Sequence, residues 1–248
     1  MERLRGEQEP EHWPAPTISV NIPTRNEQRG IGAVLRRLPA VVELVVVDSS
    51  SDSTADLIAC QRPHRTTIIQ AAAGIAAARQ YGAAVARGEW LLFSDADVTY
   101  APDYFDRVAP YLAGDAFFGP KYATARYQQY GRFFSGGQHL LHSLGIAAAS
   151  GSNMAVRKAV FRAVGGFDTS LPCNEDTDLM LRIKRRGYAV AFANDLAVTS
   201  INDRRLEQGL VRKTAHSAAR SLLLLLCGRL PLLRRVLYHD WGYWRNRE

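Results

Sequence analysis

Four β-rich apolar segments alternate with helical segments over the first hundred residues, and this alternation restricts the fold more than any other feature. The predicted strands are residues 17–22, 41–47, 66–70 and 89–93, and the predicted helices are residues 29–37, 54–62 and 74–87. Strands and helices that alternate with short connections are typical of an open α/β sheet with mostly parallel strands. The nearly continuous apolar run at 41–47 is expected of a parallel strand that is buried on both faces.

The second half of the chain has a less regular pattern. It predicts a helix or helical hairpin over residues 127–149, helices over 155–164 and 175–186, and a strand over 188–193. We therefore expect a flexible N-terminal tail at 1–16, one α/β domain at 17–205 and a basic amphipathic C-terminal segment at 206–248. With 248 residues, of which 47% are hydrophobic, the chain is long enough for one sizeable core.

Cysteine usage and charge narrow the class of protein further. The three cysteines have neither the number nor the spacing of a disulfide framework or a zinc site, which favours a reducing, cytoplasmic compartment. The net charge of +7 comes from residues 204–248, which hold ten Lys and Arg but three acidic residues. A neutral body with a basic end predicts an anionic surface as partner, either a membrane or a nucleic acid.

The C-terminal segment combines leucines, arginines and late aromatic residues. Its longest uninterrupted apolar run is the six residues 222–227, whereas a membrane-spanning helix needs about 20. No secretory signal is visible at the N-terminus. We expect peripheral contact with the cytoplasmic face of an anionic membrane. Packing of the leucines on the domain, or a dimer interface, are the alternatives.

Two carboxylates follow the fourth predicted strand at Asp95-Ala96-Asp97. Ligands of open α/β sheets bind beyond the carboxyl ends of the strands. Oxygen ligands at that edge suit Mg²⁺ or Mn²⁺ that bridges a diphosphate. The simpler interpretation is a solvated turn, since Asp is common in turns.

Two further acidic positions lie where chemistry is expected. Asp48 ends the second predicted strand and can accept hydrogen bonds from a base or a ribose, whereas the residues after it cap the next helix. Glu175, Asp176 and Asp178 open an amphipathic helix. The helix dipole alone favours acids there, but clustered carboxylates also raise one another's pKa and create a usable general base.

Several other chemistries lack their motifs. The chain has no G-x-G-x-x-G after its first strand, no Walker A loop and no G-x-S-x-G elbow, and its six histidines lack H-E-x-x-H spacing. These absences count against dinucleotide oxidoreductases and P-loop NTPases.

Taken together and in order, these segments resemble the family 2 glycosyltransferases, which have the GT-A fold. The resemblance covers about residues 18–205. Its motifs are Ser19-Val20-Asn21-Ile22-Pro23-Thr24-Arg25-Asn26-Glu27, Val46-Val47-Asp48, Gly74-Ile75-Ala76-Ala77-Ala78-Arg79, Asp95-Ala96-Asp97, Gly151-Ser152-Asn153-Met154, Gly165-Gly166-Phe167-Asp168 and Glu175-Asp176 with Asp178-Leu179.

The resemblance implies inverting transfer of a sugar from a UDP- or GDP-type nucleoside-diphosphate sugar to a glycan, lipid-phosphate or glycolipid acceptor, with Mg²⁺ or Mn²⁺ as cofactor. It implies nucleotide binding by Pro23, Thr24, Arg25, Glu27, Asp48, Arg79 and Asp95. Asp97 would be the main metal ligand and Asp95 would contact ribose or metal-bound water. Asp176, beside Glu175, would be the general base, and Gly151, Ser152 and Asn153 would shape the donor-sugar and acceptor side.

Departures from the family pattern refine this expectation. The Gln-x-x-Arg-Trp signature of processive synthases is missing, which favours transfer of a single sugar. The turn after the second predicted strand lacks the glycine that many relatives have there, which leaves the identity of the nucleotide base undetermined. His216 or His239 is a candidate to complete the metal shell. A non-catalytic sugar-nucleotide-binding protein and a nucleic-acid-binding protein are the alternative functions, although no nucleic-acid motif accompanies the basic end.

Overall fold

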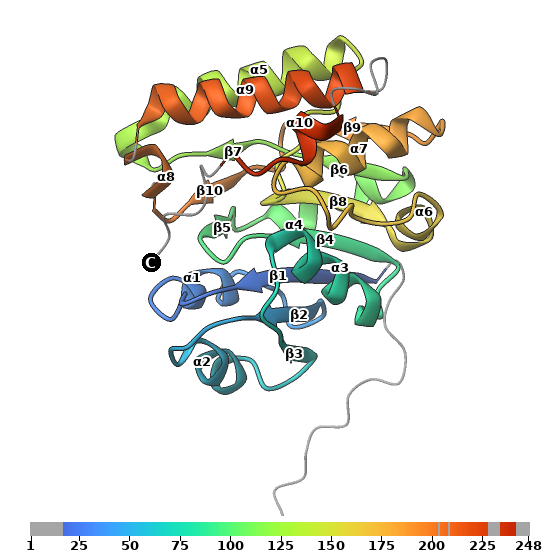
Figure 1. The fold of residues 1–248 in the computed structure, drawn as a ribbon. Coiled ribbons are helices and arrows are strands. Elements are labelled where there is room, and N and C mark those ends of the chain that lie inside the picture. The colour runs from blue at the N-terminus through green and yellow to red at the C-terminus, as the bar shows by residue number, and fades with distance from the viewer. Residues whose placement is uncertain (1–16, 203, 208, 228–233, 242–248) are drawn as a thin grey trace, which may run out of the picture.

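The computed structural model describes residues 17–202, 204–207, 209–227 and 234–241, arranged as two sheets with helices around them (Figure 1). The larger sheet has seven strands in the order β3-β2-β1-β4-β8-β6-β9. These strands are β1 (Ile18–Thr24), β2 (Glu43–Asp48), β3 (Thr66–Gln70), β4 (Trp90–Ser94), β6 (Ala116–Phe118), β8 (Asn153–Arg157) and β9 (Val190–Phe192). The expected N-terminal tail lies outside the described residues.

The four strands expected from the first half form the parallel part of this sheet. β1 pairs in parallel with both β2 and β4, and β2 pairs in parallel with β3. Helices α1 (Ile31–Leu35), α2 (Thr54–Gln61) and α3 (Ile75–Val85) connect these strands. Every residue of β2 is buried, which explains its continuous apolar run. The prediction of a mostly parallel α/β sheet is therefore confirmed.

One predicted helix is wrong at its start. Residues 153–157 form strand β8, and helix α6 (Lys158–Ala163) begins only after it. β8 lies antiparallel between β4 and β6, where Met154 is paired with Phe93 on one side and Phe118 on the other. A short apolar run carries no periodicity that separates strand from helix, so the partners on both sides decide its conformation.

A second, three-stranded sheet lies next to the ends of the large one. It contains β5 (Val98–Tyr100), β7 (Lys121–Tyr122) and β10 (Val198–Ser200), in the order β5-β10-β7. Helix α4 (Tyr104–Arg107) and the 3₁₀ turns η1 (Ala109–Ala113) and η2 (Ala125–Tyr127) connect the strands of this region. β5 follows Asp97 directly, and β7 brings Lys121 close to it.

The remaining helices cover the upper part of the molecule. They are α5 (Gln128–Ser143), α7 (Glu175–Arg185), α8 (Arg204–Glu207), α9 (Leu210–Cys227) and α10 (Arg234–Tyr238). The segment expected to be a helix or hairpin contains the single helix α5, which lies beside α9 (Figure 1). A Thr214 Oγ1 to Tyr130 hydroxyl contact of 3.3 Å joins them.

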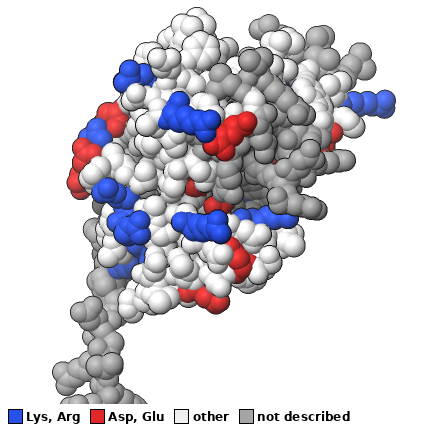
Figure 2. Space-filling view, turned by 90° about the vertical axis from the view of Figure 1, so that its left-hand side faces the viewer, with Lys and Arg blue, Asp and Glu red and all other residues white. Residues whose placement is uncertain are grey.

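Part of the C-terminal segment packs on the domain. Leu224 of α9 and Leu237 of α10 are buried against Leu171 and Leu181. No helix in the described part of the chain has both the length and the apolar content needed to cross a membrane. Lys and Arg side chains are interspersed with Asp and Glu on the face shown in Figure 2, so its described residues form no patch of one sign.

Candidate active site

The ends of β1 and β2 bring together the residues expected to hold the nucleotide. Asp48 is buried, and its Oδ1 accepts hydrogen bonds from Thr24 at 2.5 Å and Ser50 at 2.6 Å. Its Oδ2 accepts one from Gln70 Nε2 at 3.1 Å. The carboxylate of Asp48 is therefore held in one orientation by strands on both sides of β2.

The other nucleotide residues expected in this region lie at the end of β1 and in the turn after it. Pro23 lies within β1 and is paired with Val47, Arg25 of the turn is exposed, and the backbone N–H of Glu27 donates to Thr54 Oγ1 at 2.9 Å. Asn26 adopts a left-handed conformation with φ of 55°. Its side chain accepts from the N–H of Ser51 at 2.9 Å, so this turn is tied to the turn after β2. Asn26 is therefore a structural residue of the site that its motif alone did not indicate.

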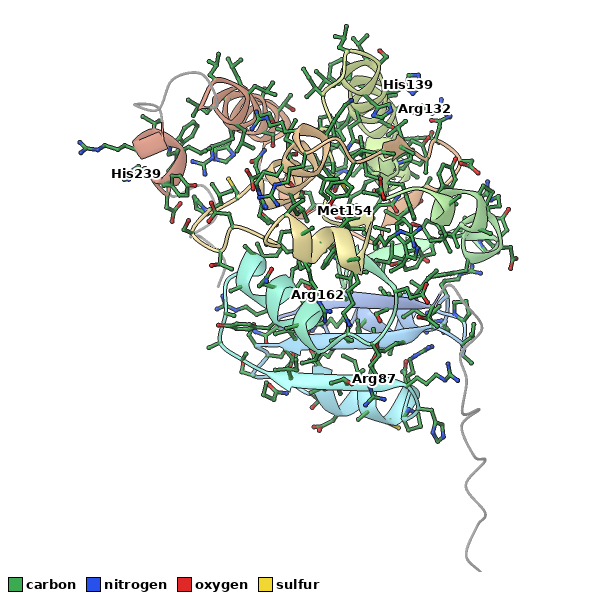
Figure 3. The ribbon with its side chains drawn as sticks, turned by 90° about the vertical axis from the view of Figure 1, so that its right-hand side faces the viewer. Arg87, Arg132, His139, Met154, Arg162 and His239 are labelled. Atoms are coloured by element: carbon green, nitrogen blue, oxygen red, sulfur yellow. The ribbon has the colours of Figure 1, made fainter. Side chains whose placement is uncertain are left out.

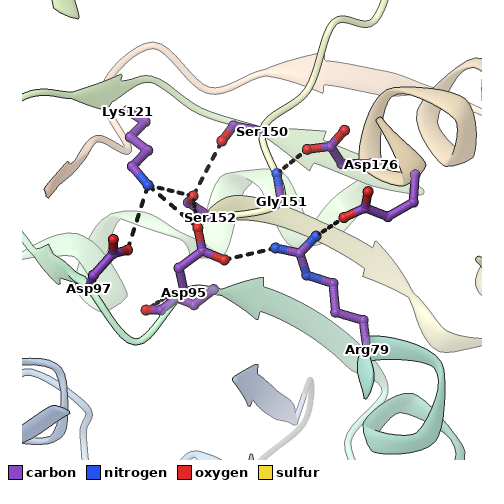
Figure 4. A network of polar contacts seen from close by, with 10 residues as sticks. Arg79, Asp95, Asp97, Lys121, Ser150, Gly151, Ser152 and Asp176 are labelled. Carbon is purple, nitrogen blue, oxygen red and sulfur yellow. Dashed lines mark hydrogen bonds and ion pairs between the residues drawn. The ribbon is translucent and has the colours of Figure 1, made fainter. Parts of the chain in front are cut away.

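Arg79 joins two acidic groups that are far apart in the sequence (Figure 4). From α3, its guanidinium donates to Asp95 Oδ1 at 2.8 Å and to Glu175 Oε1. The side chain is 2% exposed. Burial by itself lowers the pKa of Arg79, but the carboxylates of Glu175 and Asp95 outweigh it and raise that pKa. The Asp95 and Glu175 regions thus form one network around a permanent cation.

The start of α7 places Glu175 and Asp176 side by side. Asn174 precedes them with φ of 62°, a conformation that Asn tolerates better than most residues. Burial raises the pKa of Glu175 to about 7, against the opposing effect of Arg79. Burial also raises the pKa of Asp176. A carboxylate with a raised pKa is suited to accept a proton near neutral pH.

Backbone N–H groups orient Asp176. Its Oδ2 accepts from the N–H of Gly151 and its Oδ1 from the N–H of Thr177, both at 2.7 Å. Gly151 also packs against Arg79 so closely that a Cβ atom there would overlap the guanidinium. The loop at 150–152 therefore contacts both the base candidate and the central arginine.

Ser152 and Asn153 have different surroundings although they are adjacent. Ser152 donates to Asp95 Oδ2 and lies within the network of Figure 4. The fully buried Asn153 side chain donates to the carbonyls of Pro120 at 3.0 Å and Leu196 at 2.6 Å, and accepts from the Tyr104 hydroxyl at 2.7 Å. Asn153 therefore joins β8 to α4 and to the segments that lead into β7 and β10.

Asp95 and Asp97 converge on one cationic atom. Lys121 Nζ lies 3.4 Å from Asp95 Oδ2 and 3.8 Å from Asp97 Oδ1. Lys121 was not among the expected site residues because it lies on a two-residue strand outside every motif, and no local pattern in the sequence marks it.

The convergence of two carboxylates on a cation fits a divalent ion, because such ions take few protein carboxylates and complete their shell with phosphates and water. The described residues contain no group of three or more His, Cys, Asp and Glu side chains able to hold a metal.

The candidate histidines lie in other surroundings. His216 packs on the Trp241 ring, with 5.4 Å between the ring centroids. His139 and His239 project from opposite sides of the view in Figure 3.

The mixed sheet, the Asp pair after β4 and the acidic start of α7 define a GT-A type glycosyltransferase. Fold comparison agrees, since a mannosyltransferase from Pyrobaculum calidifontis matches with a TM-score of 0.66 at 21% identity over 93% of this chain and 73% of its own. S. aureus TarS matches with a TM-score of 0.60 at 18% identity, over 74% of this chain and 36% of its own. These likenesses show the fold alone.

The family described as Glycosyl transferase family 2 matches residues 19–165, and the chain belongs to it. The chain is therefore a transferase enzyme. The succinoglycan biosynthesis protein ExoA of Rhizobium meliloti is 26% identical over 87% of this chain and 72% of its own length. The pre-mycofactocin glycosyltransferase of Mycobacterium tuberculosis is 24% identical over 82% of this chain, which spans 46% of that relative.

Proposed function

We propose that this chain transfers a single sugar, with inversion, from a nucleoside-diphosphate sugar to an acceptor hydroxyl. The observation that carries the proposal is the bridge made by Arg79 between Asp95 and Glu175. It holds the acidic pair after β4 next to the acidic start of α7, so a leaving-group side and a base side belong to one rigid site. The similar mannosyltransferase structure contains GDP-Man and Mn²⁺, and a TarS structure contains UDP-GlcNAc, which supports this class of donor.

In this proposal the nucleotide lies over the ends of β1 and β2. Asp48, held by Thr24 and Gln70, accepts hydrogen bonds from the base or ribose. Pro23, Arg25 and Glu27 border the same place. Arg79 adds a fixed positive charge on the diphosphate side.

Asp176 removes the proton from the acceptor hydroxyl while the hydroxyl oxygen attacks the anomeric carbon of the donor sugar. Its two oxygens are oriented by the N–H groups of Gly151 and Thr177, and its raised pKa favours proton uptake. Glu175 is tied to Arg79 and keeps that cation in place. Mg²⁺ or Mn²⁺ held by Asp95 and Asp97 would neutralise charge on the diphosphate leaving group.

Thermal unfolding with UDP, GDP, dTDP and CDP, each with and without Mn²⁺, tests the donor site. A ligand that binds only the native state adds about 2.7 kcal/mol at 100 times its dissociation constant. We expect one nucleotide to stabilise the protein in a metal-dependent way, and Asp97→Ala to lose that dependence. If none of the four nucleotides stabilises the protein, the proposal is contradicted.

For the acceptor, we propose a lipid-linked or envelope glycan at an anionic membrane surface. Phe133 and Leu140 of α5 and its C-cap residue Leu144 are 73%, 59% and 68% exposed and follow one another at helical spacing. Leu222 of the neighbouring α9 is also exposed. The excess of basic residues after position 203 complements anionic lipid headgroups.

A further inference from the structure

Lys121 contacts both carboxylates of the pair Asp95 and Asp97 and also the neighbouring Ser152. Its Nζ donates to Ser152 Oγ at 2.8 Å, in addition to lying 3.4 Å from Asp95 and 3.8 Å from Asp97 (Figure 4). Ser152 donates in turn to the same Asp95 oxygen. The ammonium group thus holds together two carboxylates that would otherwise repel each other.

Arg79 and Lys121, the two cationic side chains of this site, differ in how firmly their surroundings hold them. Arg79 is 2% exposed, has a carboxylate on each side and is confined by Gly151. Lys121 is 21% exposed, and its ion pairs are longer. A lysine ammonium is a point charge on a flexible four-carbon stem, whereas the planar guanidinium is fixed by its fork of hydrogen bonds. Lys121 is therefore the cation of the pair that can leave its partners.

A divalent ion that bridges Asp95 and Asp97 would lie where the Lys121 ammonium now lies, between the two carboxylates. Arg79 contacts Asp95 Oδ1, so the ion would meet Asp95 at Oδ2, the oxygen that Lys121 and Ser152 contact. Two cations on the same two oxygens repel each other. The ammonium must therefore move before an ion binds there.

We propose that Lys121 is a displaceable internal cation: it occupies the convergence point of Asp95 and Asp97, competes with the divalent ion and moves to the diphosphate when donor binds. This inference rests on the proposed donor site for its second half, because the diphosphate supplies the new anionic partner. Binding of the ion and of the nucleotide is then coupled, since each favours the position of Lys121 that admits the other.

The first experiment measures Mn²⁺ affinity without nucleotide, by electron paramagnetic resonance of free Mn²⁺. Lys121→Met removes the competing charge, and we expect Mn²⁺ to bind about tenfold tighter. Lys184→Met is the matched control, because Lys184 is a half-buried lysine of α7 and has no ion pair to either aspartate among the described contacts. An unchanged or weaker Mn²⁺ affinity in Lys121→Met overturns the proposal.

The second experiment measures the effect of saturating UDP or GDP on the same Mn²⁺ affinity. We expect a strong tightening in the wild type and a smaller one in Lys121→Met, because the variant has no ammonium to relocate. Equal tightening in both proteins overturns the coupling. If none of UDP, GDP, dTDP and CDP binds the wild type, the proposed function fails, whereas the metal-only measurement still decides whether Lys121 competes.

Two further variants keep the test decisive if Lys121→Met does not fold, as judged by circular dichroism. Lys121→Gln removes the charge but keeps a hydrogen-bond donor for Ser152, so it is expected to bind Mn²⁺ as Lys121→Met would. Lys121→Arg keeps the charge and is expected to bind Mn²⁺ no tighter than the wild type. Tighter binding in Lys121→Arg than in Lys121→Gln contradicts the competition.

Discussion

Gly151 lies against the guanidinium of Arg79, and a side chain of any size at position 151 would occupy the space of that cation. Gly151→Ala is therefore expected to push Arg79 away from Asp95 and Glu175 and leave the buried Glu175 carboxylate without its guanidinium partner. Losing one member of a buried pair costs about 3–5 kcal/mol, so a loss of stability of this order is expected in urea unfolding. Gly137→Ala in α5, where a Cβ meets no neighbour, is the control and should be neutral or stabilising.

The raised pKa of Glu175 predicts a specific dependence of stability on pH. Its pKa is about 7 in the folded protein and 4.5 as the ordinary value, so the folded state binds the proton more tightly. The stability that this group contributes is present below pH 4.5 and is lost as the pH rises to 7, by up to about 3 kcal/mol. Urea unfolding of wild type and Glu175→Gln across this range checks it. Parallel pH curves for the two proteins would contradict the expectation.

Replacement of Asp176 by Asn should separate binding from chemistry. The amide keeps the size of the side chain but cannot take a proton from the acceptor. A general base contributes about 100- to 10,000-fold to rate, so kcat should fall by this factor. Nucleotide affinity, measured by calorimetry, should remain within a few-fold of wild type. A variant that retains full turnover excludes Asp176 as the base.

We expect Asn153 to contribute mainly to the stability of the fold and not to the choice of donor sugar. Asn153→Ala removes the donor to the Leu196 carbonyl and the acceptor for the Tyr104 hydroxyl in the interior, whereas the Pro120 carbonyl keeps its hydrogen bond from the N–H of Val198. Each unsatisfied buried group costs about 1–3 kcal/mol, so a loss of at least 2 kcal/mol is expected in urea unfolding. Asn194→Ala, at an exposed position, should change stability by less than about 0.5 kcal/mol. A stable Asn153→Ala protein with altered donor preference would instead support a direct contact with the sugar.

The exposed face of α5 should determine attachment to membranes. Phe133→Glu combined with Leu140→Glu replaces two exposed apolar side chains with acids that anionic lipids repel. Burying each of the original side chains contributes about 1.5–3 kcal/mol, so co-sedimentation with phosphatidylglycerol vesicles should weaken at least about tenfold. Val41→Glu, at a similarly exposed apolar position before β2, is the control. Equal sedimentation of all three proteins would contradict the membrane proposal.

The parts of the fold that were predictable from sequence are those with local signals. β1 to β4 were located because each is an apolar run next to a polar turn, and the helices between them have their own periodicity. Residues 155–157 of β8 were expected to begin a helix because so short an apolar run has no distinguishing period, and their strand conformation comes from β4 and β6 on either side.

The site shows the same division. Asp95, Asp97, Glu175 and Asp176 stand out in the sequence because acids cluster after a strand or before a helix. The bridge from Arg79 to two acids, the cation at Lys121 and the structural role of Asn153 depend on contacts between distant segments. No local pattern carries such contacts, and the assignment of roles to the site residues stays a prediction until the variants are measured.

The position of β8 between β4 and β6 has a consequence for how relatives can diverge in length. Its register is fixed on both edges at Met154, and a shift of one residue would turn every side chain of the strand to the opposite face. Such a shift would move Ser152 and Gly151 away from Asp95 and Arg79. It would also turn the Asn153 side chain away from its partners Pro120, Leu196 and Tyr104. Insertions and deletions among homologues should therefore avoid residues 151–157 and collect in the exposed turns on either side, at 144–145 before β8 and at 169–170 after α6.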